Sequence, residues 1–182
     1  MVIAGIDYSM TSPAICVHSG DSWHINNCEF YFLTDKKKME VEMHQFTGTL
    51  MNQWTSQEER FYNNALWADE ILQKHKPSHV TLEGYAMGAK GLVFHIGENT
   101  SVLKQMMWKS GIPFDVPPPT VIKKFATGKG NANKEKLQEA FIAETGLDLK
   151  KKLGQTELSW NPSSDLIDAY YMAKYGFHQT LK

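Results

Sequence analysis

Four carboxylates occupy positions from which a folded chain could bring them into one site. Asp7 ends an apolar N-terminal segment and Glu83 ends a second one, while Asp165 and Asp168 are three residues apart near the start of a helical pattern. A lone carboxylate at the end of a buried strand is costly unless a cation or hydrogen bonds compensate it. Residues three apart share one face of a helix, where a divalent cation would reverse their mutual repulsion.

Clustering of these carboxylates would create a site for divalent metal ions. Oxygen ligands of this kind select Mg²⁺ or Mn²⁺, and two such ions about 4 Å apart can activate water and stabilise the leaving oxygen in phosphodiester hydrolysis. Taken singly, Asp7 could accept hydrogen bonds from the following turn, and Asp165 and Asp168 could cap or charge-stabilise a helix. The convergence of four carboxylates favours phosphoryl transfer to water.

The elements that must position these carboxylates alternate between apolar strands and amphipathic helices. The pattern predicts strands at residues 2–7, 14–17, 22 to about 33, 79–82 and 112–116. It predicts helices at residues 55–74, 92–110, 120–127 and about 132–144, and a final helix starting near residue 163 or 164. This order indicates an α/β fold with a five-stranded mixed sheet, antiparallel at first and then parallel, flanked by helices.

Length and composition indicate a single domain covering residues 1–182, because 42% of the 182 residues are hydrophobic and can form one substantial core. The N-terminus lacks the pattern of a signal peptide, and no apolar run is long enough to cross a membrane, so we expect a cytoplasmic protein. Cys16 and Cys28 do not form a Cys-x-x-Cys pair, which disfavours a disulfide scaffold or a zinc site.

The net charge of −1 does not by itself indicate nucleic-acid binding. The lysines are nevertheless grouped, at residues 36–38, 123–136 and 150–152, so a basic face can coexist with an acidic pocket. Lysine runs are usually solvated surface, and these become candidates for phosphate contacts only beside a site that needs them.

Five short motifs follow one another along nearly the whole chain: Gly5-Ile6-Asp7, Thr81-Leu82-Glu83-Gly84-Tyr85, Pro119-Thr120-Val121-Ile122-Lys123, Gly128-Lys129-Gly130-Asn131-Ala132-Asn133-Lys134 and Asp165-Leu166-Ile167-Asp168-Ala169. As an ordered set they resemble the motifs of RuvC-type Holliday junction resolvases, which have an RNase H-like fold. The resemblance implies a homodimeric endonuclease that cleaves branched DNA, especially four-way junctions, with two Mg²⁺ or Mn²⁺ ions per active site.

The resemblance also implies roles for individual residues. The catalytic and metal-binding group would be Asp7, Glu83, Asp165 and Asp168, with Lys134 as a further catalytic residue. The DNA-contacting group would be Lys123, Lys124, Lys129 and the aromatic Tyr85. Because residues 86–91 align in more than one way, Met87 or Phe94 could take the place of Tyr85.

The chain departs from the family pattern in two places. The turn after Asp7 lacks the family's glycine, and residues 35–55 form a long, polar and poorly patterned stretch. These differences bear on DNA specificity more than on catalysis. They are closer to divergent, phage-encoded members than to the cellular enzyme, in which case the compartment would be the host cytoplasm.

Three other functions fit parts of the sequence. Residues 5–12 also resemble the first phosphate motif of sugar kinases and actin-like ATPases, although these proteins generally need two such domains. The same fold could bind branched DNA without cutting it. The same chemistry could instead act on flaps, replication forks or RNA–DNA hybrids.

Overall fold

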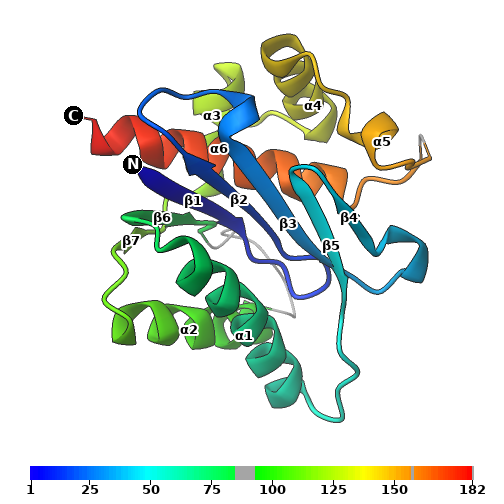
Figure 1. Cartoon of the computed structure of the whole chain (residues 1–182), viewed down its shortest axis with the longest axis vertical. Helices are drawn as coiled ribbons and strands as arrows, with labels where there is room; N and C mark the ends of the chain where they lie inside the picture. Colours follow the sequence, from blue (N-terminus) through cyan, green and yellow to red (C-terminus); the bar gives the residue numbers. More distant parts are fainter. Residues whose placement is uncertain (85–92, 157, 182) are drawn as a thin grey trace.

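The computed structural model describes residues 1–84, 93–156 and 158–181, which contain one mixed sheet with helices on both faces (Figure 1). The strand order is β4-β5-β3-β2-β1-β6-β7. The strands are β1 (Val2–Asp7), β2 (Ala14–Ser19), β3 (Cys28–Thr34), β4 (Val41–Met43), β5 (Phe46–Leu50), β6 (His79–Leu82) and β7 (Phe114–Asp115).

Strand direction brings several strand ends to one edge of the sheet. β1 and β3 each pair antiparallel with β2, so they point the same way, and β6 runs parallel to β1 while β5 runs parallel to β3. The carboxyl ends of β1, β3, β5 and β6 therefore share one edge, which we call the carboxyl edge. Loops at such an edge commonly form ligand sites in α/β proteins.

The expected α/β fold with a mixed sheet is confirmed, but the expected count of five strands is wrong. The stretch 35–55 contributes β4 and β5, which extend the sheet beyond β3. Phe46 is buried against Phe30, and a Cβ at Gly48 would lie 2.4 Å from the ring of Phe32. The third strand also begins at Cys28, because Ile25–Asn27 forms a short 3-10 turn capped by the side chain of His24.

The helices follow the predicted pattern closely. They are α1 (Gln57–His75), α2 (Val93–Lys109), α3 (Pro119–Thr127), α4 (Lys134–Thr145), α5 (Leu149–Lys152) and α6 (Ser163–Thr180). Ser56 caps α1 by accepting a hydrogen bond from the Glu59 amide at 3.2 Å. Among the helices of the described residues, the short α5 is the one that the sequence pattern does not predict. In the parts of the chain that are described, no helix is long and apolar enough to cross a membrane.

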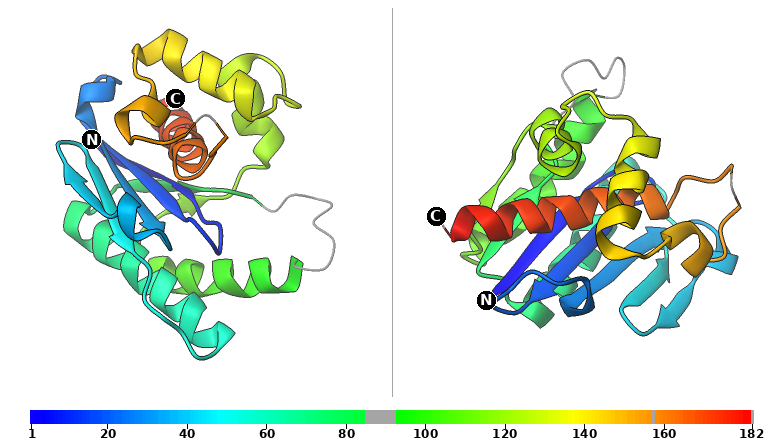
Figure 2. Two further views of the ribbon diagram at one scale, coloured as in Figure 1. Left: turned by 90° about the vertical axis from the view of Figure 1, so that its right-hand side faces the viewer. Right: turned by 90° about the horizontal axis from the view of Figure 1, so that it is seen from above.

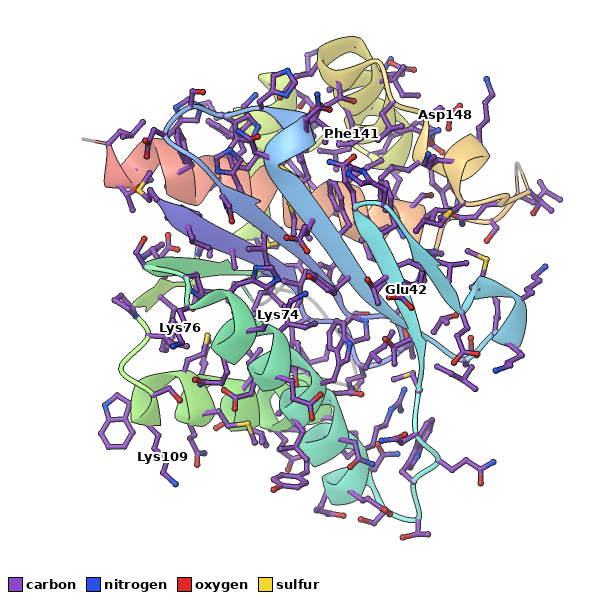
Figure 3. The ribbon with its side chains drawn as sticks, in the orientation of Figure 1. Glu42, Lys74, Lys76, Lys109, Phe141 and Asp148 are labelled. Carbon is purple, nitrogen blue, oxygen red and sulfur yellow. The ribbon has the colours of Figure 1, made fainter. Side chains whose placement is uncertain are left out.

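Two hydrophobic clusters fill the spaces between the sheet and its helices. α1 and α2 cover one face, whereas α3, α4 and α6 lie on the other (Figure 2). Phe141, labelled in Figure 3, extends from α4 to an edge-to-face contact with Tyr170 of α6, with ring centroids 4.9 Å apart. The central strands β1, β2, β3 and β6 are therefore largely buried.

Small residues allow α6 to lie directly on the sheet. A Cβ at Gly5 of β1 would be 2.1 Å from the amide nitrogen of Ala173 and 2.2 Å from the carbonyl oxygen of Ala169. Farther along, a Cβ at Gly176 would be 2.5 Å from the hydroxyl of Thr81 on β6. The beginning of α6 is thus fixed beside the end of β1.

We expect Gly5→Ala to destabilise the protein by about 1–3 kcal/mol or more, because the added methyl group would push α6 off the sheet. Thermal denaturation would measure the loss. Gly97→Ala is the matched control: this glycine lies in α2, no described atom is within 4 Å of the place where a Cβ would stand, and alanine favours helix. Equal melting temperatures for Gly5→Ala and the wild type would contradict the tight contact.

Candidate metal centre

Two neighbouring parallel strands carry the first two carboxylates to the carboxyl edge. Ile6 of β1 lies opposite Leu82 of β6, and the amide of Glu83 donates to the carbonyl oxygen of Ile6 at 3.0 Å. Asp7 and Glu83 follow at the same level, so their carboxyl groups lie next to each other and each affects the pKa of the other.

The first turns of α6 supply the other two carboxylates. Asp165 is buried and accepts hydrogen bonds from the hydroxyl groups of Ser12, at 2.5 Å, and Ser164, at 3.2 Å. Asp168, one turn later, is close enough to Glu83 and Asp165 to be repelled by both. The structure therefore brings together all four carboxylates that the sequence singles out, from β1, β6 and α6.

Crowding and burial make full ionisation of this cluster unfavourable. Burial raises the pKa of Asp7 well above its ordinary value, and repulsion from Glu83, Asp165 and Asp168 raises it further. Burial, followed by repulsion from Glu83 and Asp165, raises the pKa of Asp168 to about 7. The pKa values of Glu83 and Asp165 are also raised, mainly by burial. Positive charge from bound cations would therefore favour the ionised form of the cluster.

The donor set fits a divalent cation such as Mg²⁺ or Mn²⁺, because it consists of carboxylate oxygens at a protein surface edge. In the residues described, no three His, Cys, Asp or Glu side chains already stand in a coordinating arrangement. Because burial raises the pKa values of these carboxyl groups and metal ions bind their ionised forms, metal binding here would be accompanied by proton release.

Two of the predicted lysines lie beside the carboxylates. The Lys134 ammonium group, from the first residue of α4, donates to the Ser164 hydroxyl at 3.3 Å. Its charge lowers the pKa values of Glu83, Asp165 and Asp168, against the stronger effect of burial. Lys123 of α3 acts on Glu83 and Asp168 in the same way. Both could contact a phosphate bound over the cluster.

The remaining residues that the resemblance predicts to contact DNA are Lys124, Lys129 and Tyr85. Lys124 and Lys129 are exposed at the end of α3 and just beyond it. Tyr85 and its alternative Met87 fall outside the described residues. Phe94, the other alternative, is 79% exposed at the start of α2.

Sequence analysis missed a hydrogen-bond network that holds Asp165. The Asn161 side-chain amide donates to the Ser12 hydroxyl at 2.7 Å, and its oxygen lies 3.1 Å from the Ser164 hydroxyl. Ser12 and Ser164 in turn contact the two carboxylate oxygens of Asp165. Ser12 lies in the turn after Asp7, where the departure from the family pattern could have drawn attention to it. Asn161 lies in an irregular segment whose sequence gives no indication of this role.

A search of protein-family models finds no match. Among curated proteins, the chain is 25% identical over 152 residues to the crossover junction endodeoxyribonuclease RuvC of Chlamydia muridarum, covering 83% of this chain and 85% of that protein. Among solved structures, Thermus thermophilus RuvC in complex with a Holliday junction substrate matches with a TM-score of 0.65 at 17% identity, covering 100% and 96% of the two chains. The yeast mitochondrial Holliday junction resolvase Ydc2 matches with a TM-score of 0.58 at 14% identity, covering 98% and 78%.

The sheet topology and the structural matches show an α/β fold shared with the RuvC structures. The resemblance to RuvC-type Holliday junction resolvases that the ordered motifs indicate is confirmed.

The raised pKa of Asp168 predicts a pH-dependent stability. A carboxyl group with a raised folded-state pKa binds more protons in the folded state, so the free energy of unfolding falls as pH rises through the window from 3.8 to about 7. Thermal melts in EDTA across this window should show a steeper fall for the wild type than for Asp168→Asn. An equal fall in melting temperature with pH for the two proteins would contradict the raised pKa of Asp168.

The network around Asn161 predicts a role in metal affinity. Asn161→Ala frees the hydroxyl groups that orient Asp165, and the loss of such outer contacts typically weakens metal binding about 10- to 100-fold. Titration of Mn²⁺ followed by thermal shift would give the midpoint without any need for activity. Asn26→Ala, an exposed asparagine in the turn before β3, is the control that should leave the midpoint unchanged.

Proposed function

We propose that this chain is a metal-dependent, structure-selective endonuclease that resolves four-way DNA junctions by paired phosphodiester hydrolysis. Residues 1–182 would form a single RNase H-like nuclease domain. The observation that carries the proposal is the convergence of Asp7, Glu83, Asp165 and Asp168 at the carboxyl edge, with Lys123 and Lys134 beside them. The name of the Chlamydia relative and the junction-bound Thermus structure support the choice of substrate.

The four carboxylates would hold two Mg²⁺ or Mn²⁺ ions. Such a pair, when bound, supplies an activated water and stabilises the leaving oxygen. Hydrogen bonds from Ser12 and Ser164 keep Asp165 oriented toward the cluster. The ammonium group of Lys134 is placed to offset the charge that develops on the phosphate.

DNA binding would use the basic and aromatic groups around this centre. Lys123 is close enough to the carboxylates to lower their pKa values and can hold a phosphate near the scissile one, while Lys124 and Lys129 extend the positive surface to the end of α3 and just beyond it. We include Tyr85 as a base-stacking residue on the strength of its position after Glu83 in the motif.

A homodimer would suit a four-way junction, because two symmetric sites can nick two strands of like polarity. α2 offers apolar surface for such a dimer: Phe94 is 79% exposed, Trp108 78% and Val93 40%. Light scattering with and without junction DNA tests this part, and a monomeric mass in both conditions would contradict it.

Asp7→Asn should reduce cleavage of a labelled four-way junction in Mg²⁺ or Mn²⁺ by at least about 100-fold, because it removes one metal-binding charge without changing side-chain size. Junction binding should persist, since most of the affinity comes from phosphate contacts. Asp21→Asn, at a fully exposed aspartate, is the matched control.

The same assay distinguishes the alternatives. Symmetric nicks in the junction that disappear in EDTA are the expected result. Cutting of a flap or an RNA–DNA hybrid in preference to the junction would keep the chemistry and change the substrate. Cleavage by Asp7→Asn at the wild-type rate would exclude the carboxylate centre as the active site.

A further inference from the structure

The carboxyl edge continues past the metal centre onto the extension of the sheet. There the ends of β3 and β5 and the first turns of α1 enclose a cavity of about 170 Å³. Its lining combines aromatic and amide side chains with one basic and one acidic group: Trp54, Trp67, Asn52, Asn63, Asn64, Arg60 and Glu70. The stretch 35–55, which departs from the family pattern, builds one side of it.

The groups in this cavity match the chemistry of a nucleobase. The Arg60 guanidinium lies 4.5 Å from the centre of the Trp54 ring, which is itself 39% exposed. A planar base can stack on such a pair, and the carboxamide of Asn63 can donate to and accept from the base edge.

A direct structural link joins the cavity to the metal centre. Arg60 donates to the carbonyl oxygen of Met10 at 2.9 Å, and Asn64 donates to the same oxygen at 3.3 Å. Met10 belongs to the turn that connects Asp7 to β2, and Ser12 of the same turn binds Asp165. The cavity therefore has a fixed position relative to the carboxylates.

The surface between the two sites is polar and hollowed. A second cavity of about 190 Å³ shares Leu33 with the first, and Ser12 and Asn161 with the network around Asp165. Asp35 and Lys36 also line it, so Lys36 can contact a phosphate along this path while Asp35 offsets part of its charge. A DNA strand held at the carboxylates can thus continue along the carboxyl edge toward Trp54.

We propose that the cavity at Trp54 and Arg60 binds one unstacked nucleobase of the DNA strand that leaves the metal centre. This inference rests on the proposed nuclease function and adds a position-specific contact to it. The contact is separate from the metal ligands and from the predicted contacts on α3. As a consequence, the base of one particular nucleotide, which is not at the scissile phosphate, contributes to the binding affinity.

The test is a scan of abasic sites along the junction strand on both sides of the cut, with binding measured by fluorescence anisotropy in EDTA. The wild type should lose about 5- to 100-fold in affinity when the base at one position is removed. Trp54→Ala should weaken binding to intact DNA by a similar factor, and removal of the base at that position should then cause no further loss of affinity. Trp54→Phe, which keeps an aromatic face, should preserve the wild-type profile.

Two further variants guard against a folding artefact. Asn63→Ala changes a partly exposed group of the same cavity and should reduce the sensitivity at that position. Tyr62→Ala removes a neighbouring aromatic ring that is 52% exposed and does not line the cavity, and it should leave the profile unchanged.

The outcomes separate the two proposals. An identical abasic profile for the wild type and both Trp54→Ala and Asn63→Ala, or a profile with no sensitive position, would overturn the nucleobase site while cleavage continued. If the protein cuts no DNA in Mg²⁺ or Mn²⁺ but its abasic profile changes in Trp54→Ala and Asn63→Ala, the nucleobase site stands and the nuclease function is rejected. A wild type that binds no junction would overturn both.

Discussion

The backbone of α6 lies against Gly5 with no room for a side chain between them, and the arrangement of the carboxylate cluster follows from this contact. Gly5 precedes Asp7 by two residues, and Ala169, which touches Gly5, follows Asp168 directly. The same packing that closes the core therefore brings the carboxylate of the strand and those of the helix together. A bulkier residue at this crossing would separate the helix from the sheet and the carboxylates from one another.

Packing and electrostatics oppose each other at this site. Apolar burial along β1 and α6 holds together four carboxyl groups whose mutual repulsion and desolvation raise their pKa values. Lys123 and Lys134 offset part of this charge but leave the cluster acidic. A bound cation lowers the free energy of such a crowded site more than that of a site without repulsion. Functional sites commonly cost stability in this way.

Local sequence patterns predicted the parts of the structure that depend on local physics. Apolar runs ending in Asp7 and Glu83 identified β1 and β6, and the three-residue spacing of Asp165 and Asp168 placed both on α6. β4 and β5 escaped prediction because their stability comes from pairing with β3 and from the contact of Gly48 with Phe32. The bond between Ser12 and Asn161 joins residues 149 positions apart, and no local pattern encodes such a contact.

The extension of the sheet lies apart from the strands and the helix that carry the four carboxylates. Because β5 is parallel to β3, and β3 points the same way as β1, any loop that follows β5 emerges at the carboxyl edge. An insertion at this place therefore adds side chains to the functional edge without altering β1, β6 or α6. The turn containing Met10 and Ser12 touches both the metal centre and the cavity of Arg60. Since both sites contact this one turn, a base held in the cavity would help fix the path of the strand over the carboxylates.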